Sequence, residues 1–378
     1  MTDNCYFISS INEISKKEWE SCSGQINPFT SYDFFYALEK SGSSSEETGW
    51  KPSHYIQKNS KNEIEVICPL FIKSHSYGEY IFDHVWADAY HKYGLKYYPK
   101  LQSAIPFTPV TGKRFLVKRN NIPKNYYNKI IENIITLSSK LEISSIHFNF
   151  LTKEEINNTS INNIMLRKGI QFHWENQNFK DFNDFLAKLT SRKRKLINKE
   201  RKCLIDNNLE VEILTGNTIR NNHWDFFYKC YLNTTSKKWG AKYLNREFFR
   251  IIGELMPHKI VLILAKNEKN YIAGALNFID NESLYGRLWG STEHIPYLHF
   301  EICYYQAIDF AIKNNLKKIE AGAQGNHKIQ RGYLPKETYS LHWIKNINFK
   351  DAINSFLNEE IRIIENQKKH LRKFTPFK

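Results

Sequence analysis

Short runs rich in β-branched and aromatic residues alternate along this chain with longer stretches that carry apolar residues at helical spacing. The short runs predict strands over residues 54–58, 65–73, 113–118, 145–150, 171–174, 209–214, 260–265, 273–278, 318–322 and 339–344. The longer stretches predict helices over residues 32–40, 125–141, 182–207, 219–232, 246–255, 298–314 and 349–372. Because strands and helices alternate without a low-complexity linker, the pattern indicates a mixed α/β (α+β) protein.

Part of this pattern is repeated. His173 and Trp174 recur as His342 and Trp343, and residues 178–181 recur as 348–351. Each copy ends a predicted strand and begins a predicted helix, so the repeat predicts two similar units with mixed, mostly antiparallel sheets. Upstream, the pairs that we match are Tyr77–Gly78 with Tyr285–Gly286 and Tyr97–Tyr98 with Tyr304–Tyr305.

The length of 378 residues is about twice that of a typical domain. Together with the repeat it predicts a first domain over residues 1–176, a basic connecting helix over 177–208 and a second domain over 209–378. The six cysteines are scattered, so neither a disulfide framework nor structural zinc is expected. No leader-like start and no apolar run of spanning length is visible, so we expect a cytoplasmic protein without an integral membrane segment.

The net charge of +15 favours an anionic partner, such as nucleic acid, a phosphorylated precursor or a membrane surface. The chain is also rich in Lys, Asn and Ile, whose codons are AT-rich, so mutational bias is an equally good explanation of the excess. The basic residues Arg192, Lys195, Lys199 and Lys202 fall near one face of a predicted helix. That face could grip a phosphodiester backbone such as tRNA, or it could simply be a solvated surface.

Several long segments resemble FemAB-like predicted N-acyltransferases, which are often labelled peptidoglycan biosynthesis or recognition proteins: residues 73–94, 97–114, 171–174, 191–201, 238–240, 285–290, 298–312 and 320–335. The wider similarity is to Fem peptidyltransferases, which use aminoacyl-tRNA, and to GNAT enzymes, which use acyl-CoA. The resemblance implies two tandem GNAT-like units with the chemistry mainly in the second. It implies transfer of an acyl or aminoacyl group to an amine on a small polar acceptor, such as a cell-wall precursor. It implies no tightly bound cofactor, because acyl-CoA or aminoacyl-tRNA is a co-substrate, and it leaves the oligomeric state open.

The GNAT resemblance also directs attention to the donor-binding turn, where a helix N-terminus faces a pyrophosphate. The usual pattern is matched only in part, by Arg287, Gly290 and Thr292. The residues around this turn and around the following helix that are predicted to bind substrate are Tyr285, Arg287, Trp289, His299, Gln324 and His327. For His299, packing in the core is the alternative.

A carboxylate stands out in the predicted helix 298–314, because Glu301 falls on the apolar stripe. Burial raises the pKa of a carboxyl toward the range of a general base. The alternative is a buried acid satisfied by an Arg, a Tyr or a backbone amide. Glu301 and Glu320 are therefore the candidate bases, acting in a gap between the strands around Ala275 and Ile319.

A glycine-rich turn follows the predicted strand 318–322 and carries two cations, Lys328 and Arg331. Either could stabilise an oxyanion, and where a Fem enzyme places its loop lysine this chain offers Lys328, Gln330 or Arg331. A tight surface turn with solvated charges is the alternative. If these groups do not catalyse, the chain is a non-catalytic module that binds a cell-wall or amino-acid-derived ligand.

The first unit carries a second concentration of polar residues, predicted to bind the acceptor: Lys73, His75, Asp83, His84, Trp86, Asp88 and Lys100. The cations among them are candidate ligands for an acceptor phosphate. Their spacing matches no standard metal site, so no metal is expected. No nucleophile elbow is present either, so direct attack by the acceptor amine is preferred.

Overall fold

The computed structural model describes residues 4–119, 122–160, 163–237, 242–323 and 325–378, which form two compact units. Unit 1 contains Met1–Gly169 and Glu337–Asn366, and unit 2 contains Ile170–Lys336 and Gln367–Lys378. These bounds differ from the expected domains. Residues 337–366 pack with unit 1 instead of the second half of the chain, and the basic segment 177–208 is part of unit 2.

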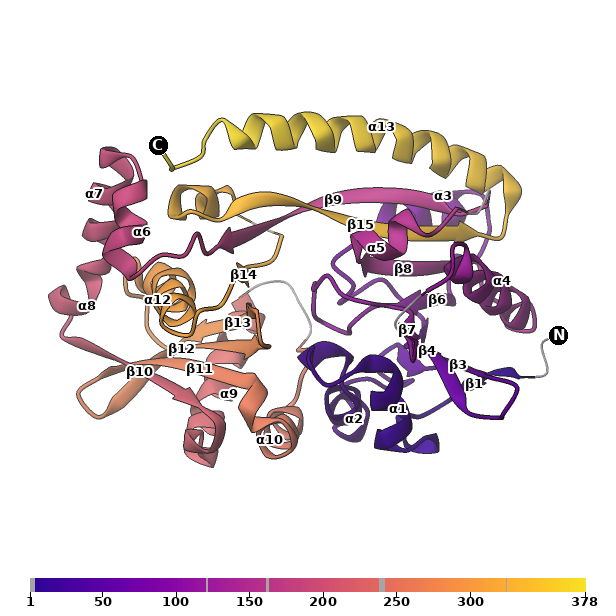
Figure 1. Cartoon of the computed structure of the whole chain (residues 1–378), viewed down its shortest axis with the longest axis horizontal. Coiled ribbons are helices and arrows are strands. Elements are labelled where there is room, and N and C mark those ends of the chain that lie inside the picture. Colours follow the sequence, from indigo (N-terminus) through magenta and orange to yellow (C-terminus); the bar gives the residue numbers. More distant parts are fainter. Residues whose placement is uncertain (1–3, 120–121, 161–162, 238–241, 324) are drawn as a thin grey trace. The chain divides into compact units, whose positions relative to one another are not determined.

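Unit 1 contains two sheets (Figure 1). A small antiparallel sheet has the order β1-β3-β4-β7, and five further strands have the order β15-β8-β6-β5-β2. Strands β6 and β8 are parallel, and the other pairings are antiparallel. The strands are β1 (Cys5–Ile8), β2 (Trp50–Pro52), β3 (His54–Lys58), β4 (Ile64–Cys68), β5 (Phe71–Lys73), β6 (Lys100–Ser103), β7 (Leu116–Val117), β8 (Ser145–Leu151) and β15 (Leu334–Ile344).

The helices of unit 1 are α1 (Lys16–Ser23), α2 (Tyr32–Lys40), α3 (His84–Lys92), α4 (Tyr126–Ser138) and α5 (Lys153–Asn157), with most of α13 (Ile347–Arg372). Helix α4 joins β6 to the parallel β8 and buries Ile130, Ile131 and Ile134. These side chains pack with Ile146 and Phe148 of β8 in one apolar core. This burial of apolar surface fixes one face of the sheet.

Unit 2 has strands in the order β10-β11-β12-β13-β14-β9. Strands β13 and β14 are parallel, and the other pairings are antiparallel. The strands are β9 (Met165–Glu175), β10 (Leu209–Thr215), β11 (Ile260–Asn267), β12 (Asn270–Ile279), β13 (Ser283–Ser291) and β14 (Lys318–Glu320). The helices are α6 (Phe182–Lys188), α7 (Ser191–Arg201), α8 (Cys203–Asp206), α9 (Asn221–Lys237), α10 (Arg246–Leu255), α11 (Leu298–Phe300) and α12 (Gln306–Lys313).

The two units share one arrangement: a parallel strand pair, a helix between its strands, and an antiparallel strand beside the second member. In unit 1 the parallel pair is β6 and β8, and β15 adds to β8. In unit 2 the pair is β13 and β14, and β9 adds to β14. Residues 170–175 of β9 therefore complete unit 2, and residues 337–344 of β15 complete unit 1. This exchange explains the repeat, because His173 on β9 and His342 on β15 occupy equivalent positions.

The prediction of two similar α/β units is confirmed, but three details are wrong. Tyr97 and Tyr98 precede β6, whereas Tyr304 and Tyr305 lie in a helix, so the upstream pairs are not equivalent. Ala275 lies on β12, and the parallel partner of β14 is β13, so the gap expected beside Ala275 is bounded by β13 instead. Residues 182–207 form three helices, because the backbone is extended at Leu189, which bridges to Phe377.

Candidate functional site

The glycine-rich turn of unit 2 is the 3-10 segment η6 (Asn326–Arg331), which follows β14. Gly325 and Gly332 flank it with positive φ angles, a conformation that glycine adopts without strain. The Lys328 ammonium donates to the carbonyl of Ala321 at 2.5 Å and of Gly322 at 3.4 Å. Lys328 is thus directed to the backbone that follows β14, and it fastens the turn there.

The second predicted cation of this turn, Arg331, is also bound within the protein. Its guanidinium donates to both oxygens of Glu200 on α7, at 2.5 and 3.0 Å, and to the carbonyl of His327 at 2.7 Å. It lies 3.5 Å from the ring centroid of Phe300. The bidentate pair to Glu200 and this stacking give Arg331 a structural role, which the glycine-turn hypothesis did not include.

Glu301 is fully buried, as its place on the apolar stripe predicts. It begins a π-helical segment, η5 (Glu301–Tyr305), of the kind often found at functional sites. Its carboxylate accepts from Arg201 at 3.2 Å and from Gln306 at 2.8 Å. Burial raises the pKa of Glu301, and the two donors offset part of that effect. This geometry matches the alternative of a buried acid paired with an arginine, although the Oε2 atom of Glu301 accepts no hydrogen bond within the described structure.

Glu320 ends β14 and is also fully buried. It pairs with Lys318 at 2.7 Å and lies 3.7 Å from Arg287 and 4.0 Å from His173. Burial alone would raise the pKa of Glu320, but His173, Lys318 and Arg287 hold it below its usual range. Glu320 is therefore an ionised structural partner, a poor general base at neutral pH.

Arg287 and Gly290 lie inside β13 and do not form the donor-binding turn that the GNAT pattern suggested. A Cβ on Gly290 would stand 2.1 Å from the carbonyl oxygen of Cys230, so the glycine is required by the close approach of α9. Tyr285, also on β13, donates its hydroxyl to Asp280. The partial GNAT pattern therefore lies on a strand, and its role in donor binding stays a prediction.

Three predicted substrate-binding residues of unit 2 come together with two further aromatic residues. The rings of Trp289 and His299 are 5.2 Å apart, those of His299 and Tyr304 5.4 Å, and those of Phe300 and His327 5.4 Å. Among them only Tyr304 is buried, whereas the other four side chains are partly accessible. We call these five residues the aromatic cluster. Gln324 and residues 238–240 lie outside the described part of the chain.

His327 is the titratable group of the aromatic cluster that is best placed for proton transfer. Its Nε2 atom lies 3.1 Å from the hydroxyl of Tyr304. Burial lowers the pKa of His327, and Arg331 and Lys328 lower it further. The imidazole is therefore neutral at pH 7 and can accept a proton.

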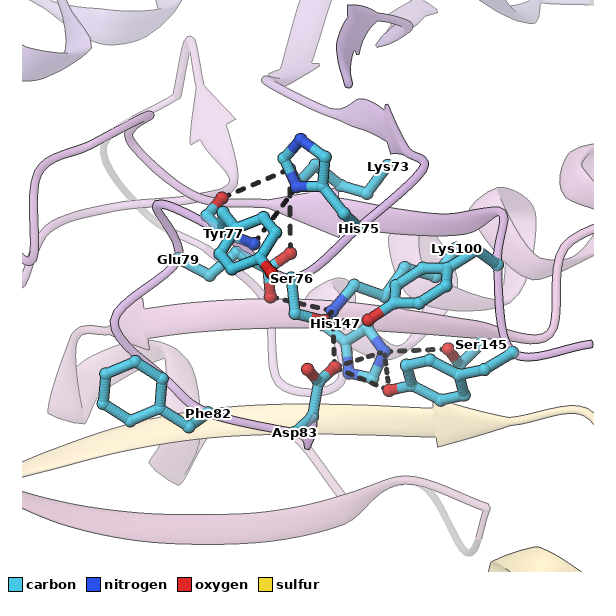
Figure 2. A network of polar contacts seen from close by, with 12 residues as sticks. Lys73, His75, Ser76, Tyr77, Glu79, Phe82, Asp83, Lys100, Ser145 and His147 are labelled. Carbon is cyan, nitrogen blue, oxygen red and sulfur yellow. Dashed lines mark hydrogen bonds and ion pairs between the residues drawn. The ribbon is translucent and has the colours of Figure 1, made fainter. Parts of the chain in front are cut away.

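Unit 1 contains the second group of predicted residues, in a buried polar network (Figure 2). Lys100 donates to Glu79 at 2.8 Å, to Ser76 at 2.8 Å and to Asp83. Lys73 lies 3.9 Å from Glu79, over the ring of Trp50. Lys73, Glu79, Asp83 and Lys100 are all at most 3% exposed.

The pKa values in this network depend on the balance between burial and neighbouring charge. Burial lowers the pKa of Lys73 to about 7 and raises that of Glu79 to about 7. Burial would raise the pKa of Asp83 and lower that of Lys100, but their mutual attraction outweighs burial in both. Both lysines thus face acids of the protein itself, so this geometry does not support their predicted role as phosphate ligands.

The network continues through Tyr97 to two histidines. Tyr97 donates to Asp83 at 2.6 Å, and its oxygen is 3.3 Å from Nε2 of His147. The Nδ1 atoms of His147 and His342 are 2.7 Å apart. Burial and Lys100 lower the pKa of His147 to about 3, and burial holds that of His342 well below its usual range. Both imidazoles are neutral, and Trp86 packs edge-on against His342.

The other predicted residues of unit 1 are not part of this network's centre. His84 and Asp88 are exposed on α3, and His75 bonds to the carbonyl of Thr48 at 2.9 Å. Sequence reasoning missed Glu79, Tyr97, His147 and His342 as members. Two of them carried a sequence signal: His342 belongs to the repeat, and Tyr97 belongs to an upstream pair whose proposed match with Tyr304 is wrong.

Within the described residues, no group of three or more His, Cys, Asp or Glu side chains could hold a metal ion. All six cysteines are free thiols. Among the helices of the described ranges, none has the length and apolar character needed to cross a bilayer.

Comparison with known proteins agrees with this architecture. FemX has a TM-score of 0.55 and 11% identity, with 90% of this chain and 98% of FemX covered. A conserved protein of unknown function from Bacteroides thetaiotaomicron has a TM-score of 0.53 and 10% identity, with 90% and 99% covered. The C-terminal domain of a putative lysylphosphatidylglycerol synthetase from Agrobacterium fabrum has a TM-score of 0.54 and 7% identity, with 91% and 96% covered.

These similarities concern the fold alone, and no curated protein matches the sequence. The model of the FemAB-like family, described as peptidoglycan biosynthesis/recognition, matches residues 10–378. Since that match spans almost the whole chain, this protein belongs to the FemAB-like family.

Proposed function

We propose that this protein is an N-acyltransferase that moves an acyl or aminoacyl group to an amine on a small polar cell-wall precursor. The observation that carries the proposal is the neutral imidazole of His327, held by Tyr304 among partly accessible aromatic rings. Membership of the FemAB-like family supports the substrate class. An acyltransferase of this kind needs a base with access to substrate, and neither Glu301 nor Glu320 is accessible.

In the proposed reaction the acceptor nitrogen attacks the donor carbonyl carbon and forms a C–N bond. The C–O bond of an ester donor, or the C–S bond of a thioester donor, then breaks. His327 accepts the proton that the amine loses and returns it to the leaving oxygen or sulfur, with the Tyr304 hydroxyl fixing the orientation of the ring. A positioned base contributes about 10²- to 10⁴-fold in rate.

The test of this role is the variant His327→Gln, which keeps a polar side chain and removes the base. Transfer to a small amine should fall about 10²- to 10⁴-fold. Glu301→Gln is the matched control, because it changes a buried acid that we place outside the reaction. Full activity of the His327 variant would refute the assignment, and donor binding without any transfer by the wild type would favour a non-catalytic binding module.

The donor is tested separately. Acyl-CoA and aminoacyl-tRNA both carry an adenosine, and a base can stack on aromatic rings such as those of the aromatic cluster. A tRNA donor also needs a cationic surface, and the side chains of Arg192, Lys195 and Lys199 on α7 and of Lys202 directly after it are all exposed. If tRNA is the donor, the double variant Lys195→Gln, Lys199→Gln should weaken tRNA binding and reduce its salt dependence. Use of acetyl-CoA should be unaffected by the same changes.

A further inference from the structure

In unit 1, one face of the strands β5, β6, β8 and β15 carries a cluster of polar side chains, with Phe71 of β5 and Ile344 of β15 at its margins. Cross-strand partners point to the same face, and the partners here are Lys73 with Lys100, Gln102 with His147, His147 with His342, and Asn149 with Ser340. Each of these residues is at most 1% exposed. We call this set the polar face. On the opposite side, Leu101, Ile146 and Phe148 belong to an apolar core.

A fully buried polar face is costly, because desolvation is offset only where every polar atom finds a partner. Many atoms of this face do, through the network around Lys100. However, both polar atoms of Gln102 and the Oδ1 atom of Asn149 have no partner within the described structure. Oε1 of Glu79 and Oδ1 of Asp83, which lie over the face, also accept no hydrogen bond within the described structure, and Oε1 of Glu79 has only the ion pair with Lys73 at 3.9 Å.

Gln102 and Asn149 lie in the second halves of the parallel strands β6 and β8, whereas Glu79 and Asp83 reach Lys100 at the start of β6. Asn149 is two residues beyond His147, the partner of Gln102, and Gln102 is two residues beyond Lys100. With about 3.3 Å per residue, the set extends over roughly 13 Å. A set of this extent can hold a monosaccharide or an amino acid that is hydrogen-bonded at both of its ends.

The chemistry of these atoms selects the ligand. Four of the five are oxygens that accept hydrogen bonds, and the fifth is the Gln102 amide nitrogen. The lysine donors are already directed to Glu79, Asp83, Ser76 and backbone carbonyls. An anion would meet carboxylates here, whereas a ligand with an ammonium group and hydroxyl groups would supply the donors that the oxygens lack.

From this geometry we propose that the polar face of unit 1 is a binding site for a small amine-bearing polyol of hexosamine size, with its ammonium group at Asp83 and Glu79 and its hydroxyl groups at Gln102 and Asn149. Lys73 accommodates the added charge, because its pKa of about 7 lets the amine lose a proton when a cation arrives. The segment between β5 and α3, which carries Glu79 and Asp83, has no helix or strand. Figure 2 shows that Phe82 of this segment points away from the network, and it is 57% exposed.

This site is separate from the acyl transfer proposed for unit 2, so the two proposals fail independently. The test is calorimetric titration of the full chain with glucosamine, and with N-acetylglucosamine and inorganic phosphate as comparison ligands. Glucosamine should bind saturably. N-acetylglucosamine lacks the ammonium group, so its affinity should be lower by at least about tenfold. Phosphate should not compete.

The deciding variant is Gln102→Leu, because the amide makes no hydrogen bond within the described structure and its removal should not unfold the protein. Glucosamine affinity should fall about tenfold or more. Tyr127→Phe is the matched control, since it removes a similarly unpartnered buried hydroxyl from the opposite, apolar core and should leave the affinity unchanged. If Gln102→Leu does not fold, Asn149→Leu replaces it.

Three outcomes would overturn the proposal. The first is no saturable binding of glucosamine to the wild type. The second is binding of phosphate in its place, which would identify an anion site. The third is glucosamine binding that Gln102→Leu leaves intact, which would locate the ligand elsewhere.

Discussion

The two units place different chemistry at equivalent positions of the same strand arrangement. Beside the second parallel strand, His342 faces His147 in unit 1, and His173 faces Glu320 in unit 2. In unit 1 the pair is neutral, 2.7 Å apart and sealed from solvent. In unit 2 the acid is ionised, 4.0 Å from its histidine and close to the cations Lys318 and Arg287.

The difference shows how one backbone plan supports two kinds of site. Unit 1 gathers its charges inside, with acids from an irregular segment brought onto lysines of the sheet. Unit 2 holds its charged groups behind the aromatic cluster, where Glu200 and Arg201 of α7 bind Arg331 and Glu301. The candidate site of unit 2 is therefore aromatic and partly accessible, whereas the polar network of unit 1 is ionic and buried.

The largest expected effect comes from removing the central cation of unit 1. Lys100→Met leaves Glu79 and Asp83 buried without their main partner, and a broken buried pair costs about 3–5 kcal/mol. Urea unfolding measures this loss. The control is Lys318→Met in unit 2, where the lysine side chain is 39% exposed and Arg287 and His173 remain near the buried Glu320, so a smaller loss than that of Lys100→Met is expected. Equal losses in the two variants would contradict the contrast between the units.

The second prediction compares the repeated histidines. His342→Leu leaves Nδ1 of His147 and the hydroxyl of Ser340 without their partner, which costs about 1–3 kcal/mol. His173→Leu loses only a 3.4 Å contact to Gln171 and a distant pairing with Glu320, so its cost should be under about 1 kcal/mol. Chemical denaturation of both variants decides the order. A larger loss at His173 would contradict the stronger structural role that we assign to His342.

Much of the fold could be predicted from the sequence, because it depends on local signals. Helices α2 and α10 agree with prediction at both ends, since each begins after a capping side chain, Ser31 or Asn245, and keeps one apolar stripe. The sequence did not predict strands β6 and β13, because they lack such a local signal. Their buried faces carry Lys100, Gln102 or Arg287, so the apolar alternation that identifies a strand is absent.

The site was less predictable, because its contacts join distant segments. The sequence indicated Lys100 and Asp83 separately, but spacing alone cannot bring Glu79 and His147 to the same lysine network. The exchange of β9 and β15 between the units is equally invisible, since the repeat shows that two strands are alike and not which unit each one joins. Burial of Glu301 was predictable from its helical position, but its pairing with Arg201 was not.

The smallest expected effect is a pH dependence that comes from Lys73 of unit 1. Burial lowers the pKa of Lys73 to about 7, whereas the unfolded side chain titrates at 10.5. Between these values the unfolded state holds the proton and the folded state does not, so the free energy of unfolding rises with pH across this window. Burial raises the pKa of Glu79 from 4.5 to about 7, so this group makes the free energy of unfolding fall as the pH rises from 4.5 to 7. Above pH 8 it adds little to the slope. Relative to Lys73→Met, the wild type should therefore gain on the order of 1 kcal/mol per pH unit between pH 8 and 10. Unfolding in urea at each pH gives the difference, and a flat difference would show that Lys73 stays protonated in the folded protein.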